Sequence, residues 1–339
     1  MRVELRVLDI NVWHGHYARS WIRIEPLEPE GAREAREQAL IEGIRILDPH
    51  VVTFQECFPQ PAFADRVARA LGYEHVSQVS NAGLRIFGAG YPLGVDTGEG
   101  STILAKPGLG LRSLGRRALS GYGYTNHRVS FQFIDKRMAL GCAVELGGKT
   151  VVIVTCHVRY DWASFDLFES AWRVLLERGV VEGEAPPELV RSVRNNIIRR
   201  DAEIDALAAW VEKVAPDEAP FVISGDLNVD DEAPQLVPFM KRIKAANVLV
   251  LANSPTRTWD PVRNPHIAPS ASFTHPDGSP KDISGIVGAY HDQLQQRPDH
   301  IYIGGRIREE LAAASVVLDE PIGGVLPSDH FGVLATIKL

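Results

Sequence analysis

The sequence predicts an α/β fold in a single domain, and three observations support this prediction. Short apolar runs of strand length alternate with longer stretches whose apolar residues recur at helical spacing. Polar residues follow several of the apolar runs directly. No internal repeat and no low-complexity linker divides the chain, so the simplest organisation is one domain over residues 1–339, with a helical insertion at about 161–190.

The first half of the chain predicts two helices among a series of strands. The helices, Gly31–Leu47 and Phe63–Leu71, have apolar residues at helical spacing and end at Asp48-Pro49 and at Gly72. Gly147-Gly148 supplies a tight turn for a hairpin between the last two strands. The predicted strands are Arg2–Val12, Val51–Gln55, Tyr73–Val79, Ser101–Lys106, Val129–Ile134, Arg137–Leu146 and Val151–Cys156.

The second half of the chain predicts three helices and a long loop. An aromatic-rich helix is followed by an acidic, proline-containing break at Val181–Pro187, and Asn253–Lys281 is rich in loop residues. The predicted helices are Phe165–Arg178, Arg191–Val214 and Gln235–Ala246. A buried strand is predicted from Phe221, and short strands at His300–Ile303, Ser315–Leu318 and Gly332–Lys338.

Composition excludes several classes of protein. The net charge of −7 gives no global positive field that would attract nucleic acid, although a local patch would suffice. Three cysteines without CxxC spacing predict buried, reduced thiols. No apolar run is long enough to cross a bilayer, and the alternating pattern at the start of the chain is unlike a signal peptide, so we expect a cytoplasmic protein. The sequence leaves the oligomeric state open.

The stretch Phe221–Asp230, F-V-I-S-G-D-L-N-V-D, is central to the prediction of function. Gly225 tolerates backbone angles that other residues resist, and it precedes Asp226 and Asn228. Side chains two residues apart on an extended chain point the same way, so both polar groups would face one point beyond the strand. An Asx-type turn explains the same residues equally well.

Chemically useful residues recur at predicted strand ends. Asn11, Glu56, His157 and Asp226 each follow an apolar run, and Asp329-His330 precedes one. Carboxylates and amides without thiolates are hard oxygen ligands, which favour Mg²⁺ or Mn²⁺ over Zn²⁺. Histidines nearby would transfer protons or stabilise developing negative charge. Together these residues indicate the metal-assisted hydrolysis of a phosphoester.

At this point the chain resembles the endonuclease/exonuclease/phosphatase superfamily, which includes deoxyribonuclease I and the neutral sphingomyelinases. The resemblance implies a four-layer α/β sandwich, with two mixed sheets face to face and helices outside. It also implies a Mg²⁺-dependent phosphoester hydrolase, with Mn²⁺ as a substitute cation. The matching stretches, in the family's order, are Asp9–Gly15, Val51–Cys57, Val154–Val158, Ile223–Asn228, Arg297–Ile303 and Ser328–Val333.

The resemblance implies three residues at the metal. Glu56, in F-Q-E, resembles the main magnesium ligand, and Asn11 resembles the amide that supports the same ion. Asp329 resembles a second ligand to metal or water. The alternatives are structural, namely a solvated glutamate and an asparagine that only forms a turn.

The catalytic roles follow in the same way. Asp226 and Asn228 resemble the pair that positions the attacking water and hydrogen-bonds the phosphate. His157 resembles the histidine that donates to a phosphate oxygen or to the leaving group; a core histidine is its alternative. His330 resembles a general base or phosphate contact, with Asp299 orienting its imidazole. The base is either Asp226 or His330, and the Asp299 partner favours His330.

The substrate predicted is a phosphodiester, either a lipid headgroup or a nucleic acid. Asn11-x-Trp13 and S-D-H-F-G-V are most similar to the sphingomyelinase branch. Lys136 is a candidate substrate-binding residue, since that branch has a phosphate-contacting lysine after an aspartate; an ordinary surface lysine is the alternative. Arg137 follows it where relatives commonly have glycine.

Three further features bear on the substrate. Aromatic residues after His157 would contact a lipid or a membrane surface if exposed, and would pack into a core otherwise; they are Trp162, Phe165, Phe168 and Trp172. A basic cluster would suit a nuclease if it held a phosphate backbone, or would be a solvated loop; it consists of Arg112, Arg116 and Arg117. A binding module without catalysis is the third alternative, and the intact set of candidate residues argues against it.

Overall fold

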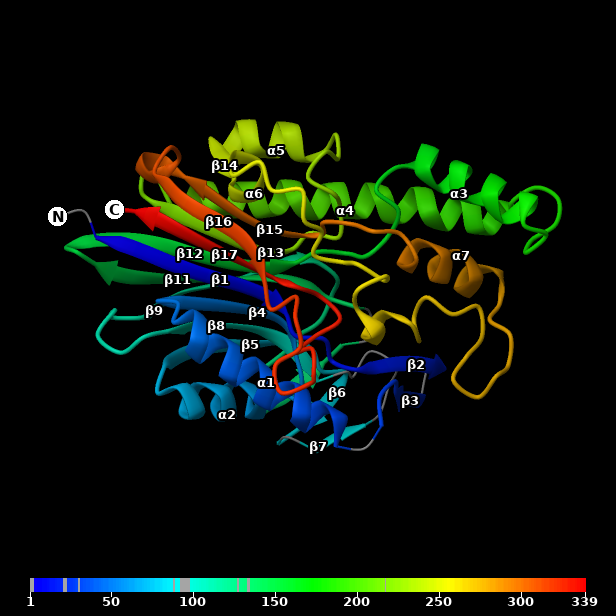
Figure 1. Ribbon diagram of the computed structural model, residues 1–339, viewed down its shortest axis with the longest axis horizontal. Coiled ribbons are helices and arrows are strands. Elements are labelled where there is room, and N and C mark those ends of the chain that lie inside the picture. The colour runs from blue at the N-terminus through cyan, green and yellow to red at the C-terminus, as the bar shows by residue number, and fades with distance from the viewer. Residues whose placement is uncertain are drawn as a thin grey trace.

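The computed structural model describes residues 3–20, 23–29, 31–87, 89–91, 98–126, 128–132, 135–216 and 218–339. Two six-stranded mixed sheets form its centre (Figure 1). The first has the order β16 (Leu311–Val317), β17 (Gly332–Lys338), β1 (Glu4–Asn11), β4 (Val51–Cys57), β8 (Glu99–Ala105), β5 (Glu74–Asn81). The second has the order β14 (Ala245–Asn247), β15 (Asp299–Gly304), β13 (Phe221–Asp226), β12 (Lys149–His157), β11 (Arg137–Leu146), β9 (Arg112–Ser120).

The sheets pack face to face through apolar side chains that alternate along their strands. Val7 and Val51 of the first sheet and Ile153, Val222 and Ile301 of the second belong to one fully buried cluster. Burial of each such side chain contributes roughly 1.5–3 kcal/mol, so this layer is a principal source of stability. It holds the two sheets, and the polar residues at their strand ends, in one fixed relation.

Helices cover the outer face of each sheet, as Figure 1 shows. α1 (Ala32–Leu47) and α2 (Ala62–Leu71) pack on the first sheet. α4 (Pro187–Val214) and α5 (Leu236–Ile243) pack on the second. The predicted four-layer α/β sandwich is therefore confirmed.

A helical lobe extends beyond the sandwich at the right of Figure 1, where α3 (Phe165–Glu177) and α7 (Ile283–Asp292) lie beside one end of α4. It contains the helix predicted within the insertion at about 161–190. Trp162, Phe168 and Trp172 are only 5%, 1% and 6% exposed, and Phe165 packs against the same core. These aromatic residues form the core of the lobe, so they are not free to contact a lipid.

Smaller elements complete the described chain. A three-stranded sheet has the order β10 (Val129–Phe131), β6 (Leu84–Ile86), β7 (Ala89–Tyr91), and β2 (His16–Ser20) pairs with β3 (Arg23–Pro26). The short helices are α6 (Val248–Leu251), η1 (Pro265–Ile267) and η2 (Gly305–Ile307). Of the predicted strand Val129–Ile134, residues 133 and 134 lie outside the described residues, as does residue 2 of the predicted strand Arg2–Val12.

Several predicted elements differ from the structure. α4 begins at Pro187, inside the predicted break, because proline is well suited to the first turn of a helix. The predicted helix Gln235–Ala246 is too long: it ends at Ile243, Lys244 takes a left-handed conformation, and the chain then pairs as β14. α7 was not predicted, although Asp282 caps it by accepting from Gly285 N at 2.7 Å.

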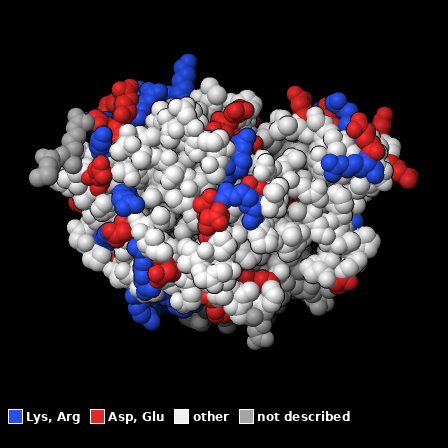
Figure 2. All heavy atoms as spheres, in the orientation of Figure 1, with Lys and Arg blue, Asp and Glu red and all other residues white. Residues whose placement is uncertain are grey.

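The basic cluster Arg112, Arg116 and Arg117 lies on a strand, β9, at the edge of the second sheet, and not in a loop. Its arginine side chains are exposed and line no part of the candidate active-site pocket described below. Figure 2 shows basic and acidic side chains interspersed over the visible face, without a large patch of one sign. The three cysteines are buried and free, as predicted. Among the described helices, none is long and apolar enough to cross a membrane.

Candidate active site

Polar strand ends from both sheets converge on one pocket of about 480 Å³. It collects carboxylates, histidines, amides and aromatic rings from segments far apart in the sequence. Its lining includes Trp13, His14, Glu56, Glu99, Arg137, His157, Tyr160, Asp226, Asn228, Trp259, Asp292, Asp329 and His330. Of the predicted site residues, Asn11 and Asp299 lie directly behind this lining. Lys136 is not part of the lining, but it lines a small neighbouring cavity that shares Glu56 and His157 with this pocket.

Neighbouring parallel strands deliver Asn11 and Glu56 side by side. β1 pairs with β4 so that Asn11 is opposite Gln55, and the positive φ of 56° at Glu56 turns its side chain toward the pocket. Asn11 Nδ2 donates to Glu56 Oε1 at 3.1 Å and to Asp226 Oδ2 at 3.0 Å. Asn11 Oδ1 accepts from Trp13 N at 3.0 Å, so in this conformation Asn11 orients the carboxylates with its nitrogen.

Asp226 and Asn228 reach the pocket through a turn that begins as β13 ends. Asn228 has a φ of 53°, and its backbone N donates to Asp226 Oδ1 at 2.8 Å. The Asx-type turn is therefore present, and both side chains line the pocket as well. Gly225 has a φ of 150°, and a Cβ there would lie 2.0 Å from the Cys156 carbonyl oxygen, so only glycine fits.

His330 is held by Asp299 and points toward Asp226. Its Nδ1 lies 2.8 Å from Asp299 Oδ2, and its Nε2 lies 3.9 Å from Asp226 Oδ2. Burial lowers the pKa of His330, but the charge and hydrogen bond of Asp299 outweigh it and raise that pKa well above 6.5. The paired imidazole is therefore a cation at neutral pH.

The long loop Asn253–Lys281 supports this pair, although the sequence indicated only a surface segment. Asn264 Nδ2 donates to the carbonyl oxygens of Ser328 and Asp329, at 2.9 Å each. Trp259 packs edge-on against the His330 ring, with centroids 4.9 Å apart. The loop thus fixes the backbone and the ring that present His330 to the pocket.

His157 lies between the carboxylates and a guanidinium. Its Nε2 is 3.6 Å from Asp226 Oδ2, 3.9 Å from Glu56 Oε1 and 3.3 Å from Arg137 Nη1. Burial and then the charge of Arg137 lower the pKa of His157 to about 3. His157 is therefore a neutral imidazole at neutral pH, and Arg137 carries the positive charge at this position.

The carboxylates fit a divalent cation. Burial is the main cause that raises the pKa of both Asp226 and Asp329 to about 7. The negative charge of Asp299 raises the pKa of Asp226 further, and the negative charge of Glu56 does the same for Asp329. Burial also raises the pKa of Glu56, but its neighbours, His14 first among them and including the hydrogen bond from Asn11, together lower that pKa to about 2. Buried carboxylates that repel one another are stabilised by a bound cation, and their oxygens suit Mg²⁺ or Mn²⁺.

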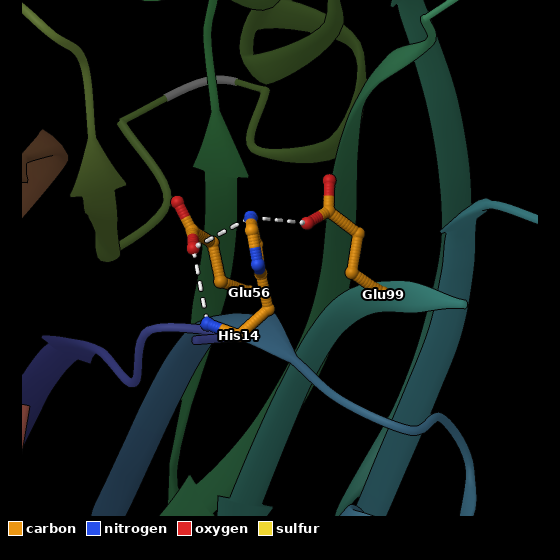
Figure 3. Close-up of side chains that lie close together, drawn as sticks. All are labelled: His14, Glu56 and Glu99. Atoms are coloured by element: carbon orange, nitrogen blue, oxygen red, sulfur yellow. Dashed lines mark hydrogen bonds and ion pairs between the residues drawn. The ribbon is translucent and has the colours of Figure 1, made fainter. Parts of the chain in front are cut away.

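His14 and Glu99 extend the site beside Glu56, as Figure 3 shows. His14 Nδ1 accepts from His16 N at 3.1 Å, so Nε2 is the ring nitrogen directed at the two glutamates. Nε2 lies 3.4 Å from Glu56 Oε2 and 3.5 Å from Glu99 Oε2, and His14 N also donates to Glu56 Oε2 at 3.2 Å. His14 therefore contacts Glu56 Oε2, whereas the other carboxylate oxygen, Oε1, accepts from Asn11. Neither His14 nor Glu99 was assigned a role from the sequence, although His14 lies within the matching stretch Asp9–Gly15.

Lys136 does not line the pocket, whereas Arg137 does. Lys136 Nζ donates to the Gly123 carbonyl oxygen at 2.7 Å, and the side chain is buried, so it is not an ordinary surface lysine either. Arg137 pairs with Asp135, with Nη2 at 2.8 Å from Oδ2. The strand β11 begins at Arg137. The side chain of Arg137, and not that of Lys136, is directed toward the pocket.

A layered α/β fold with carboxylates, amides and histidines at converging strand ends defines a class of phosphoester hydrolases. A model of the Endonuclease/Exonuclease/phosphatase family matches residues 10–330, and the chain belongs to this family. The resemblance that the motifs indicated is thereby confirmed at the level of the superfamily. Its sphingomyelinase branch stays a prediction.

Solved structures share the fold at low sequence identity. TDP2 from D. rerio, complexed with a single-strand DNA product, is 15% identical with a TM-score of 0.56, and 98% of each chain is covered. The mannosyl-6-phosphatase Bt3783 of Bacteroides thetaiotaomicron is 14% identical with a TM-score of 0.57, again over 98% of each chain. An endonuclease/exonuclease/phosphatase family protein from the same species is 14% identical, with a TM-score of 0.58, over 100% of this chain and 99% of that one. No curated protein matches this chain.

Proposed function

We propose that this protein is a divalent-cation-dependent phosphodiesterase. The observation that carries the proposal is the convergence of Glu56, Asp226, His157, Asp329 and His330 on one pocket. Glu56 and Asp329 would hold Mg²⁺ or Mn²⁺. When bound, the cation would neutralise charge on the phosphate as the transition state forms.

The remaining residues supply proton transfer and orientation. We assign the base to Asp226, because its pKa of about 7 suits a carboxylate that accepts a proton from water near neutral pH. His330, held as a cation by Asp299, would donate from Nε2 to a phosphate oxygen. Asn11 and Asn228 fix the Asp226 carboxylate through hydrogen bonds of 3.0 and 2.8 Å. The sequence favoured His330 as the base; its pairing with Asp299 supports the donor role.

Two substrate classes fit the pocket walls. Tyr160 and Trp259 line it beside Asp292, and both donate hydrogen bonds to that residue, Tyr160 Oη to Oδ1 at 2.6 Å and Trp259 Nε1 to the carbonyl oxygen at 3.0 Å. Aromatic rings next to a carboxylate suit a quaternary ammonium, as in the headgroup of sphingomyelin. The same rings would stack on a base of an oligonucleotide. The second class is the alternative that the TDP2 complex with single-strand DNA supports.

A substrate screen tests the proposal. Sphingomyelin, a single-stranded oligonucleotide, supercoiled plasmid and bis(p-nitrophenyl) phosphate are incubated with Mg²⁺, with Mn²⁺ and with EDTA. Cation-dependent cleavage of one of them, lost in Asp226→Asn, is the expected result. Cleavage of p-nitrophenyl phosphate alone would make the protein a monoesterase. Absence of cleavage with either cation would favour a binding module.

A further inference from the structure

We propose that Arg137 binds the substrate phosphate directly, as a fixed cationic anchor beside His157. This inference rests on the proposed function, since it concerns the same pocket. It assigns to Arg137 the phosphate contact that the sequence had predicted for Lys136.

The first support is location. Among the described residues that line the pocket, Arg137 is the only lysine or arginine. Arg137 Nη1 is 3.3 Å from His157 Nε2. His157 Nε2 is in turn 3.6 Å from Asp226 Oδ2. The guanidinium therefore lies at the edge of the space in which the proposed base would act.

The second support is rigidity. Arg137 Nε and Nη2 both donate to Asp135 Oδ2, at 3.0 and 2.8 Å, and the Arg137 side chain is only 15% exposed. Asp135 thereby holds one edge of the planar guanidinium and leaves the Nη1 edge directed at His157. A guanidinium held in this way loses little conformational entropy when it binds an anion, and it matches two phosphate oxygens at once.

The third support is charge balance. Glu56, Asp226, Asp299 and Asp329 bring four carboxyl groups to one site, and the three aspartates are buried, which opposes the entry of an anionic phosphate. Arg137 provides a positive charge on the side of His157, and this charge is permanent over the accessible pH range. It would therefore offset part of that repulsion where it borders the pocket.

The test measures anion binding separately from turnover. Inorganic phosphate and phenyl phosphate are titrated into Arg137→Ala, Arg137→Lys and the unaltered protein by calorimetry with Mg²⁺ present. We expect phosphate affinity to fall about 10- to 100-fold in Arg137→Ala, the range of one or two charge-assisted hydrogen bonds. Arg137→Lys should recover part of it, and KM should change more than kcat. Arg116→Ala on the adjacent strand is the control, since Arg116 is exposed and opposite Leu140 of β11.

Three outcomes would overturn the proposal. The first is phosphate affinity in Arg137→Ala within twofold of the unaltered protein. The second is an equal loss in Arg116→Ala. The third is a loss of Mn²⁺ affinity and of thermal stability along with phosphate affinity, which would show that Arg137 only supports the site. If the unaltered protein hydrolyses no substrate yet binds phosphate through Arg137, the proposed function fails and this inference stands.

Discussion

Glu56 is the residue on which the proposed chemistry depends most. Asn11 approaches one of its carboxylate oxygens and His14 approaches the other, so neither oxygen is left without a neighbour. A glutamine at this position keeps nearly the same shape but replaces one oxygen by a nitrogen that cannot bind a cation.

We expect Glu56→Gln to retain the fold and to lose nearly all turnover, because the proposed cation loses its main carboxylate. Circular dichroism and thermal melting check the fold, and Mn²⁺ binding followed by electron paramagnetic resonance checks the site. Glu74→Gln is the matched control, since Glu74 is exposed on β5. Unchanged Mn²⁺ affinity in Glu56→Gln would remove Glu56 from the cation site.

Asp9 lies behind the pocket, fully buried. Its Oδ1 accepts from Thr53 Oγ1 at 2.6 Å and from Gln55 Nε2 at 2.9 Å. Burial raises the pKa of Asp9 well above 3.8, and the charges of Asp299 and Asp226 raise it further. In the folded state the group therefore holds a proton at pH values where the unfolded chain has released it.

This shift predicts a pH dependence of stability. A raised folded-state pKa means that the folded state binds more protons than the unfolded state above pH 3.8, so the stability from Asp9 falls as pH rises through the folded-state pKa. Asp9→Asn, which stays neutral, should gain stability relative to the unaltered protein as pH rises. Urea unfolding from pH 5 to pH 8 measures it. A constant difference across that range would contradict the prediction.

At the scale of elements, the turn after β13 shows how backbone geometry positions the candidate catalytic groups Asp226 and Asn228. β13 is entirely buried, with β12 on one side and β15 on the other. Gly225 is opposite Cys156 in this pairing, and the close contact with the Cys156 carbonyl leaves no space for a side chain. The strand can turn Asp226 into the pocket only because residue 225 has no Cβ.

Gly225→Ala should destabilise the protein by about 3 kcal/mol or more, through a strained φ together with a steric clash. The control is Gly148→Ala in the hairpin turn between β11 and β12. Gly148 also has a positive φ, of 75°, but a Cβ there meets no atom, so a cost of about 1 kcal/mol is expected. Chemical denaturation compares the two variants, and equal costs would refute the steric argument.

The elements differed in how well the sequence predicted them. β11 and β17 have the predicted bounds, because their apolar patterns are long and end at clear turns. β9 was missed because its exposed, arginine-rich pattern lacks an apolar face, and its pairing with β11 is what makes it a strand.

In the site, motif residues such as Glu56 and Asp226 were predictable from the chain. Arg137 and Trp259, which line the pocket, and Asn264, which supports the Ser328 and Asp329 backbone, were not assigned roles, because only tertiary packing places them there.

At the scale of the whole molecule, the pocket joins the two sheets. Asn11 and Glu56 belong to the first sheet, and Asp226 and Asp299 belong to the second. Asn11 Nδ2 bridges them by donating to Glu56 and Asp226. A cation bound by these groups would connect the two halves of the sandwich.

We therefore expect Mg²⁺ or Mn²⁺ to stabilise the folded protein. Cation at 100 times its dissociation constant should add about 2.7 kcal/mol of stability, and EDTA should remove it. Differential scanning calorimetry measures the shift in Tm between samples with Mg²⁺ or Mn²⁺ and EDTA-treated samples. The shift should vanish in Glu56→Gln. An equal shift in that variant would place the cation elsewhere.

The arginines of β9 have one more consequence, which concerns solubility. An unpaired sheet edge offers free backbone donors and acceptors to the edge of another molecule, and positive charges along it discourage such association. Arg112, Arg116 and Arg117 place three such charges on the outermost strand of the second sheet. Replacing them with threonine would leave the candidate active-site pocket intact and would make the protein more prone to form aggregates through that edge.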